Sequence, residues 1–415
     1  MIAGAGVIGV TTAWELASRG HEVTVIEAAP GPAEGASFAN GAQISPSESV
    51  PWASPSNLRM AVKWMWQADG PFRLKPTADT RQWGWLVRFL ANCRQNRWEA
   101  NARPMVAMAL YSQQRLAAIR DAAGIDYDRE DRGILRIFPT APALHEAGDV
   151  IGVMAGHGVD MRMLGGDEIA ELEPALGPAL EQGRIAGGIL APGDETGDAA
   201  GFTAGLAAAA AREGVRFAWN SKVERIVTHG DRFHAVETPG GRIGGDALIV
   251  CAGLGAPQLT RRLGFDLPIY PLKGYSVTRR LGSSNLAPRI SITDEGRRMV
   301  ISRLGGRIRA AGKADLVGYD PALKTARAGG LMRDLERIYP ALDYDGPPEY
   351  WTGLRPMTPN GIPLIGTTPV QGVYLNTGHG SLGWTMACGS AGLIADILDG
   401  RTPALPARDY RPVLF

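Results

Sequence analysis

Cysteine and histidine are scarce in this 415-residue sequence, which has three cysteines and six histidines. Cys93, Cys251 and Cys388 lie far apart and form no CxxC pair, and the histidines show no ligand-like spacing. These patterns indicate neither a disulfide framework nor a zinc site. The sequence therefore predicts no bound metal and a reducing, cytoplasmic compartment.

An excess of charge of one sign is also missing, because 43 Lys and Arg face 42 Asp and Glu. Without a long basic stripe, nucleic acid is not an expected partner. No run reaches the roughly 18 to 20 uncharged apolar residues that a spanning helix needs. The apolar start lacks a basic leading region, and Glu15 and Arg19 interrupt it, so it does not read as a signal peptide. Export and membrane insertion are not expected.

What the sequence does have is a glycine fingerprint at its start, where Gly4, Gly6 and Gly9 form G-x-G-x-x-G. A helix over 10–19 and a strand over 21–26 follow, and Glu27 stands 18 residues after Gly9, placed to bind an adenosine ribose. This pattern predicts dinucleotide binding. Only three residues precede Gly4, so either the chain begins later than its natural start or the first strand is frayed and holds the cofactor less tightly.

Two later segments, each far along the chain from the first, also have the pattern of strands in a nucleotide-binding domain. The apolar run 247–253 reads as a buried parallel strand, and 372–376 reads as another strand that leads through a glycine loop into a helix ending at Leu398. A helix N-terminus behind such a loop can stabilise negative charge on a reduced flavin ring. The alternative is a helix entry that only closes the sheet.

The intervening segments have β-sheet and hairpin character, notably 133–138, 274–279 and the pair 299–303 and 307–311. At this length two domains are expected, since single cores seldom exceed about 250 to 300 residues. The fold class is therefore α/β, with a discontinuous Rossmann-like domain and an α+β substrate domain built on a mostly antiparallel sheet.

Longer motifs, in order along nearly the whole chain, are more specific than the first glycines. They are SFANGAQISPSESVPWASPS from Ser37, DETGD from Asp194, PLKGYSVT from Pro271, WTGLRPMTPNG from Trp351 and LNTGHGSLGWTMACGS from Leu375. In these segments the chain resembles the FAD-dependent D-amino-acid dehydrogenase small subunit, within the D-amino-acid oxidase and glycine oxidase superfamily. It departs from that family at Asn360, where an acid is usual, and at Lys313, where a neutral residue is usual.

The resemblance implies oxidative deamination, in which a D-amino acid gives its α-hydrogen as hydride to FAD and leaves as a 2-oxo acid and ammonia. The FAD-binding domain is predicted over 1–50, 192–260 and 345–415, and the substrate domain over 51–191 and 261–344. Two alternatives stay open. One is an oxidase or dehydrogenase of glycine, sarcosine, D-proline or D-hydroxyproline, and the other is a non-catalytic flavoprotein subunit.

Four residues are the candidates for the catalytic site. Arg355 offers a planar, bidentate cation to the substrate carboxylate, as the arginine of this Gly-Leu-Arg-Pro segment does in the superfamily; the alternative is a structural ion pair. Tyr275 is either a hydrogen-bond donor to that carboxylate or a packed strand residue. Lys273 either approaches the flavin through water or is a surface or ion-paired lysine, and His379 contacts the flavin through its backbone or its ring.

The predicted cofactor-binding residues come from the glycine fingerprint, the ribose acid, the loop after Ser37, the two later segments and the short strand 223–227. They are Gly4, Gly6, Val7, Ile8, Gly9, Glu27, Ser37, Asn40, Gly41, Ala42, Gln43, Val223, Cys251, Ala252, Gly253, Gly378, His379, Gly380, Ser381, Leu382 and Gly383. The acidic segment 194–198 could form a metal site, but Asp198 precedes an alanine-rich helix and is expected to be its N-cap.

One region hints at a further partner. Six of the ten tryptophans, Trp52, Trp64, Trp66, Trp83, Trp85 and Trp98, lie between 52 and 98, and residues 81–98 carry four arginines and no acid. Such a segment can rest on an anionic membrane surface, peripheral to the inner membrane, where a quinone or another carrier takes the electrons. Core packing is the alternative, and the oligomeric state is not predicted.

Overall fold

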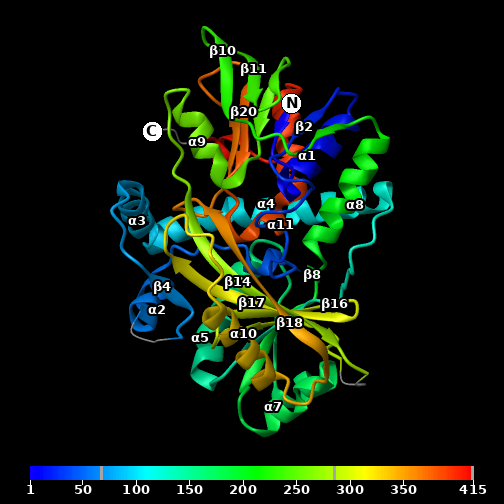
Figure 1. Cartoon of the computed structure of the whole chain (residues 1–415). Coiled ribbons are helices and arrows are strands. Elements are labelled where there is room, and N and C mark those ends of the chain that lie inside the picture. The colour runs from blue at the N-terminus through cyan, green and yellow to red at the C-terminus, as the bar shows by residue number, and fades with distance from the viewer. Residues whose placement is uncertain (66–68, 284–286, 413–415) are drawn as a thin grey trace.

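The computed structural model describes residues 1–65, 69–283 and 287–412, without the side chains of residues 62, 63 and 65. Figure 1 shows two sheets stacked one above the other, with the helices α4 (Gln95–Ala123) and α11 (Gly383–Leu398) crossing between them. The N-terminus belongs to the upper sheet.

The upper sheet has six strands in the order β19-β20-β13-β1-β2-β9. Five of them run parallel, and only the edge strand β19 is antiparallel to its neighbour. This is the predicted Rossmann-like sheet. Its strands are β1 (Ile2–Ala3), β2 (Thr24–Ile26), β9 (Arg216–Ala218), β13 (Leu248–Val250), β19 (Leu364–Thr367) and β20 (Val373–Thr377).

The first strand is short but central. Ile2 pairs with Val25 and Ile249 on its two neighbours, and the N-terminal amine of Met1 donates a hydrogen bond of 2.7 Å to Ala247 O. The expectation of a frayed strand is therefore wrong, because neighbours on both sides hold even two residues in place.

Alternation along these strands sorts the core into two layers. Ile2, Val25 and Ile249 pack under α1 (Val7–Ala17), α8 (Ala199–Arg212), α11 and α4, whereas Ala3 and Ile26 face the opposite side. That opposite side is covered by α9 (Ala256–Arg261) and a three-stranded sheet. The strands of this small sheet are β10 (Arg225–His229), β11 (Arg232–Thr238) and β12 (Gly241–Gly244).

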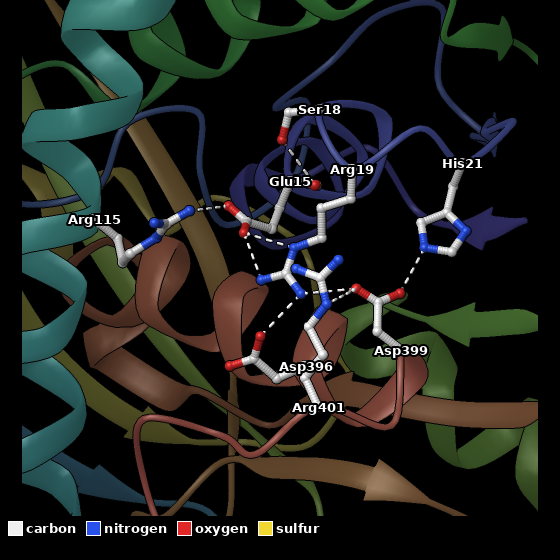
Figure 2. Close-up of polar contacts among 8 residues, drawn as sticks. All are labelled: Glu15, Ser18, Arg19, His21, Arg115, Asp396, Asp399 and Arg401. Atoms are coloured by element: carbon white, nitrogen blue, oxygen red, sulfur yellow. Dashed lines mark hydrogen bonds and ion pairs between the residues drawn. The ribbon is translucent and has the colours of Figure 1, made fainter.

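A charge network joins three of these helices, as Figure 2 shows. Glu15 of α1 is buried and accepts hydrogen bonds from Arg19, at 2.8 Å, and from Arg115 of α4. Arg19 also donates to Asp399, 3.0 Å away, at the end of α11, which in turn lies 2.7 Å from His21. The network fixes how α1, α4 and α11 pack against one another.

One helical segment, Gly380–Leu398, is long and apolar enough to cross a membrane by length and composition, which the sequence reading did not notice. However, 72% of it is buried inside the protein, between α1 and α4. That burial is typical of a core helix.

The lower sheet has nine strands, in the order β18-β14-β17-β16-β15-β5-β7-β6 with β4 also paired to β17. Apart from the pairs β15–β5 and β17–β4 it is antiparallel, and β16 and β17 form the predicted hairpin. Its strands are β4 (Phe72–Leu74), β5 (Ile134–Phe138), β6 (Arg162–Leu164), β7 (Gly187–Ala191), β14 (Tyr270–Leu281), β15 (Ser291–Asp294), β16 (Met299–Leu304), β17 (Arg307–Leu316) and β18 (Tyr344–Met357).

The remaining elements surround this sheet. α10 (Thr325–Ile338) packs on its lower face, and the short strands β3 (Gln43–Ile44) and β8 (Glu195–Thr196) pair with each other near the upper domain. The other helices are α2 (Pro55–Met65), α3 (Thr80–Asn92), α5 (Ala141–Ala155), α6 (Gly166–Leu172) and α7 (Gly177–Glu181).

Two of the predicted domain boundaries need correction. β18 was placed in the FAD-binding domain from residue 345, yet it pairs along its length with β14 of the lower sheet. α4 was placed in the substrate domain, yet its buried side chains Met105, Met108 and Leu116 pack with α1 and α11 in the upper core. In both cases pairing with a segment far along the chain decided the domain.

Candidate active site

A cavity of about 1230 Å³ is lined by residues of both sheets. It reaches from the first glycines and Glu27 of the upper domain to Arg355 and the strands of the lower sheet. All but one of the predicted cofactor-binding residues line it, and the exception, Gly9, lies one position behind the lining residue Ile8. The predicted cofactor-binding residues therefore lie together on one cavity surface.

The glycine fingerprint has the geometry that a bound pyrophosphate needs. Gly4 has φ +107°, and a Cβ on Gly9 would lie 1.9 Å from Gly4 O, so α1 can approach β1 only with glycine there. A Cβ on Gly6 would meet only Ser37 Oγ, at 3.6 Å. The start of α1 is thus open to the cavity, where its N-terminal N–H groups can bind an anion.

Glu27 directly follows β2 and lines the cavity. Its Oε2 accepts a hydrogen bond of 2.6 Å from Ala5 N, and its Oε1 accepts one of 2.9 Å from Ala29 N. The two backbone donors fix the carboxylate, and each oxygen keeps a second lone pair for a ribose hydroxyl.

The loop after Ser37 connects the two domains. Ser37 Oγ accepts from Val7 N at 3.2 Å, and Asn40 Oδ1 accepts from Ala42 N at 2.9 Å while Ala42 has φ +61°. A Cβ on Gly41 would lie 2.5 Å from a methyl of Val300. This loop is thereby pressed against the lower sheet.

The Gln43 amide lies in the same loop and donates to Ser291 Oγ at 3.0 Å and Thr293 Oγ1 at 3.2 Å. Both acceptors are on β15 of the lower sheet. The Gln43 side chain therefore holds the loop to that sheet.

Two further segments of the upper domain complete this end of the cavity. Cys251, Ala252 and Gly253 follow β13 directly, as expected. Burial raises the pKa of the Cys251 thiol to about 12, so it stays protonated. Val223 also lines the cavity, but it was assigned to a strand and instead precedes β10, which belongs to the small three-stranded sheet.

The glycine loop from Gly378 to Gly383 lines the cavity and leads into α11. Gly378 has φ +80°, and a Cβ there would lie 2.9 Å from Thr358 Cγ2. His379 is buried, and burial alone lowers its pKa to about 3, so the ring is neutral near pH 7. Its Nε2 has no hydrogen-bond partner among the described residues.

Arg355 lies where β18 meets the cavity. Its Nη1 donates to Lys313 O at 3.1 Å, and its guanidinium carbon is 6.0 Å from the centre of the Trp52 ring. A Cβ on Gly274 would lie 2.4 Å from Nη2, so the guanidinium lies flat across that glycine. Burial lowers the Arg355 pKa to about 10, which leaves it charged near pH 7. No carboxylate pairs with it within the part of the chain that the structure describes.

Tyr275 and Lys273 have other partners. The Tyr275 hydroxyl donates to Asp315 Oδ2 at 3.2 Å, and its ring packs in the core under α10. The Lys273 amine is buried, donates to Ala322 O and lies 3.7 Å from Asp320, and Lys273 is not among the residues that line the cavity. Tyr275 nevertheless lines the cavity, whereas its hydroxyl is bonded to Asp315. The contacts of Tyr275 with the substrate and of Lys273 with the flavin stay predictions.

The residues present fit FAD. Buried Nε2 of His379 and buried Oδ1 of Asn376 are both without a hydrogen-bond partner among the described residues, and both side chains line the cavity beside the glycine loop. Unpaired buried polar atoms are costly unless a ligand satisfies them. Together with Glu27 and the exposed N–H groups at the start of α1, these two atoms could form hydrogen bonds with the polar groups of a flavin dinucleotide.

The sequence matches the family described as FAD dependent oxidoreductase over residues 1–397. The chain belongs to this family. Relatives named D-amino acid dehydrogenase include one from Agrobacterium fabrum, 42% identical over 408 residues and covering 98% of this chain and 97% of the relative. Another, from Paramagnetospirillum magneticum, is 44% identical over 407 residues, 98% of this chain and 96% of the relative.

Solved structures share the fold of this FAD-dependent oxidoreductase. Glycine oxidase from Geobacillus kaustophilus superposes with a TM-score of 0.78 at 22% identity, covering 99% of this chain and 97% of that one. L-proline dehydrogenase from P. horikoshii gives 0.77 at 19% identity, with 99% and 96% covered. The predicted fold class is confirmed, and so is FAD as the cofactor of this family.

The two departures from the family pattern have distinct structural settings in this FAD-dependent oxidoreductase. Asn360 Oδ1 accepts from Ile362 N at 3.3 Å, so the amide oxygen makes the turn contact that a carboxylate could make. Lys313 lines the cavity with φ +60°, and its amine donates to Asp69 O and Oδ1 at 2.9 and 3.0 Å.

Sequence reasoning missed a polar wall of the cavity formed by Glu48, Arg136, Glu295 and Arg298. Arg136 donates to Glu295 at 2.5 Å across 159 residues of sequence, and Arg298 lies 2.8 Å from the same carboxylate. No local motif connects these positions. The pairing of β5 with β15 brings Arg136 to Glu295, and Glu48 reaches Arg136 from the short helical turn Pro46–Glu48.

Proposed function

We propose that this FAD-dependent oxidoreductase deaminates D-amino acids oxidatively to 2-oxo acids and ammonia. The observation that carries the proposal is Arg355, a charged guanidinium at the cavity wall that pairs with no carboxylate in the described chain. An unpaired buried charge is costly, and a substrate carboxylate would compensate it with bidentate hydrogen bonds. The relatives named D-amino acid dehydrogenase support the same substrate class.

The chain's own residues position the substrate rather than carry its electrons. FAD, when bound, supplies the acceptor for the hydride that leaves Cα. Arg355 holds the carboxylate, and the neutral His379 ring and the glycine loop line the same cavity, where they would hold the flavin. Because His379 is unprotonated near pH 7, its Nε2 is not a cation that would oppose hydride departure from the substrate.

Anaerobic bleaching of the flavin absorbance tests the proposal, with D-alanine, L-alanine, D-proline and glycine added in turn. Bleaching by D-alanine and not by L-alanine is expected. Preference for D-proline or glycine would favour the imino-acid or glycine-type alternative. A bound flavin that no amino acid bleaches would favour the non-catalytic subunit and contradict the proposal.

We propose further that α3 rests on an anionic membrane surface, where a quinone or another carrier takes the electrons. Trp83, Val87 and Leu90 lie on one helical stripe and are 44%, 66% and 43% exposed. Arg88 and Arg94 are exposed nearby. Apolar side chains flanked by arginines favour such a surface. Trp85 instead follows the core-packing alternative, donating to Met357 O at 2.8 Å, and Trp66 lies outside the described residues.

Vesicle flotation tests the membrane contact. We expect the protein to bind vesicles that contain anionic lipid, and the double variant Arg88→Glu/Arg94→Glu to lose binding while keeping turnover with an artificial dye. Arg212→Glu, on the exposed end of α8, is the matched control and should still bind. No binding by the unaltered protein would end this proposal and leave the deamination proposal intact.

A further inference from the structure

The cavity continues past Arg355 along the lower sheet. The guanidinium covers Gly274 on β14 and donates to Lys313 O on β17. On the next two strands Met299 pairs with Gly312 and with Asp294, so Arg298 and Glu295 follow at the same end of the sheet. With strands about 4.8 Å apart, Glu295 lies roughly 10 Å beyond β17. This extension is long enough for an extended side chain.

We call this extension the Glu48 arm, and it is lined by Glu48, Arg136, Thr293, Glu295 and Arg298. Within the arm the Glu295 carboxylate forms ion pairs with both arginines, 2.5 Å from Arg136 Nη2 and 2.8 Å from Arg298 Nη1. The nearest cation to Glu48 is the same Arg136, 3.8 Å from its Oε1. That Oε1 is buried and has no hydrogen-bond partner among the described residues. The two arginines balance the two carboxylates in formal charge, but both arginines lie closest to Glu295, so Glu48 is the more weakly compensated carboxylate.

Other nearby groups add no further cation to Glu48. Lys313 directs its amine to Asp69, as its two hydrogen bonds of 2.9 and 3.0 Å show. Asp194 is bonded to Ser47 in the layer behind the arm and is itself a carboxyl group. Burial raises the pKa of the Glu48 carboxyl, as expected for a carboxylate with too little compensation.

We propose that Glu48 binds the cationic end of a substrate side chain, so that this FAD-dependent oxidoreductase prefers basic D-amino acids such as D-lysine. The proposal rests on the function proposed above, because it assumes that Arg355 holds the α-carboxylate. From there the side chain extends along the arm. A lysine amine reaches roughly 6 Å from its Cα through five single bonds. The hydrogen bonds of the α-carboxylate to Arg355 and of the amine to Glu48, each about 2.8 Å long, supply the rest of the roughly 10 Å span.

The test compares D-lysine with D-norleucine, which has the same carbon chain without the amine. The second-order rate constant for anaerobic flavin reduction is measured, since it does not depend on the electron acceptor. We expect D-lysine to be favoured about tenfold or more, as for a charge-assisted hydrogen bond. Glu48→Gln should reduce that ratio about tenfold. Glu171→Gln, which removes an exposed carboxylate from α6, should leave the ratio unchanged.

Three outcomes would overturn the inference. The first is equal rates for D-lysine and D-norleucine in the unaltered protein. The second is a D-lysine preference that survives in Glu48→Gln. The third is a preference for D-glutamate over D-norvaline, which would mean that Arg298 and not Glu48 binds the end of the side chain. If Glu48→Gln does not fold, the comparison in the unaltered protein still decides. Bleaching by D-alanine without a D-lysine preference refutes only this inference, whereas no bleaching by any D-amino acid refutes the proposed function.

Discussion

At the scale of single residues, the decisive feature is a charge kept without a partner. Most arginines near the cavity are paired, as Arg136 and Arg298 are with Glu295. Arg355 instead donates a hydrogen bond to a backbone carbonyl and lies over the ring of Trp52. These contacts orient a guanidinium without neutralising it, which leaves its charge for a ligand.

Replacing Arg355 by Ala should raise the KM for a D-amino acid about 100-fold, since two charge-assisted hydrogen bonds to the carboxylate are lost. Arg355→Lys should give an intermediate KM, because lysine keeps the charge and loses the planar pair of donors. Steady-state kinetics measures both. The flavin absorbance of each purified variant is the control, and an unchanged KM in Arg355→Ala would remove this residue from the site.

His379 should make the stability of the protein depend on pH. Its pKa is about 3 when folded, against 6.5 for the free side chain. Between these values the unfolded chain binds a proton that the folded chain does not, so stability is present above pH 6.5 and is lost as the pH falls. From pH 6.5 to 5 this amounts to about 2 kcal/mol.

Urea unfolding of His379→Gln at a series of pH values measures this contribution. The variant should lose about 2 kcal/mol less than the unaltered protein between pH 6.5 and 5. His145→Gln, at an exposed position, is the control and should behave like the unaltered protein. Identical pH profiles for His379→Gln and the unaltered protein would contradict the buried neutral histidine.

At the scale of elements, local patterns were read correctly and distant partners were not. The β16–β17 hairpin and the Asp198 N-cap, whose carboxylate accepts from Ala200 N at 3.1 Å, follow from adjacent residues. β18 was assigned to the wrong domain, because its 14 residues are mostly half-buried and include Gly346 and three prolines, so no alternating pattern identifies it as a strand. Its place is fixed only by pairing with β14, some 70 residues earlier.

The candidate site divides in the same way. The glycine loops and Glu27 follow the chain in order, so motif spacing located them. The Glu48 arm joins residues from 48 to 298, and no spacing rule connects them. Lys313 was noticed as a departure from the family pattern, but its partner Asp69 lies 244 residues away. Motif spacing therefore located the glycine-lined end of the cavity, whereas the end lined by the lower sheet depends on contacts between distant segments.

The packing of α1, α4 and α11 should depend on Glu15, the central carboxylate in Figure 2. Glu15→Gln leaves Arg19 and Arg115 without their shared anion, and we expect a loss of about 2 kcal/mol in the free energy of unfolding. The loss stays below that of a fully buried pair because Arg115 is 33% exposed. Urea unfolding measures it, and Glu22→Gln, at the 90% exposed carboxylate of the same region, is the control. Equal stability of Glu15→Gln and the unaltered protein would refute a structural role for the network.

At the scale of the whole molecule, the cofactor cavity is also the junction between the two sheets. Gln43 reaches Ser291 and Thr293 on β15, and Ser302 on β16 donates to Gly41 O at 2.8 Å. The loop 37–43, which lines the cavity, is thus part of the contact between the domains. A ligand bound there touches both domains and favours their joint folding.

Removal of FAD should therefore weaken the whole protein rather than one domain. Because a ligand that binds only the folded state stabilises it by mass action, FAD at 100 times its Kd should add about 2.7 kcal/mol to the free energy of unfolding. We expect calorimetry of the apoprotein with increasing FAD to show one transition whose Tm rises with concentration. Ser302→Ala removes a hydrogen bond between the domains without touching the glycine fingerprint, so it should lower the Tm in the presence and in the absence of FAD. Two separate transitions, of which FAD moves only one, would show instead that the upper domain binds the dinucleotide alone and that the junction contributes nothing to cofactor retention.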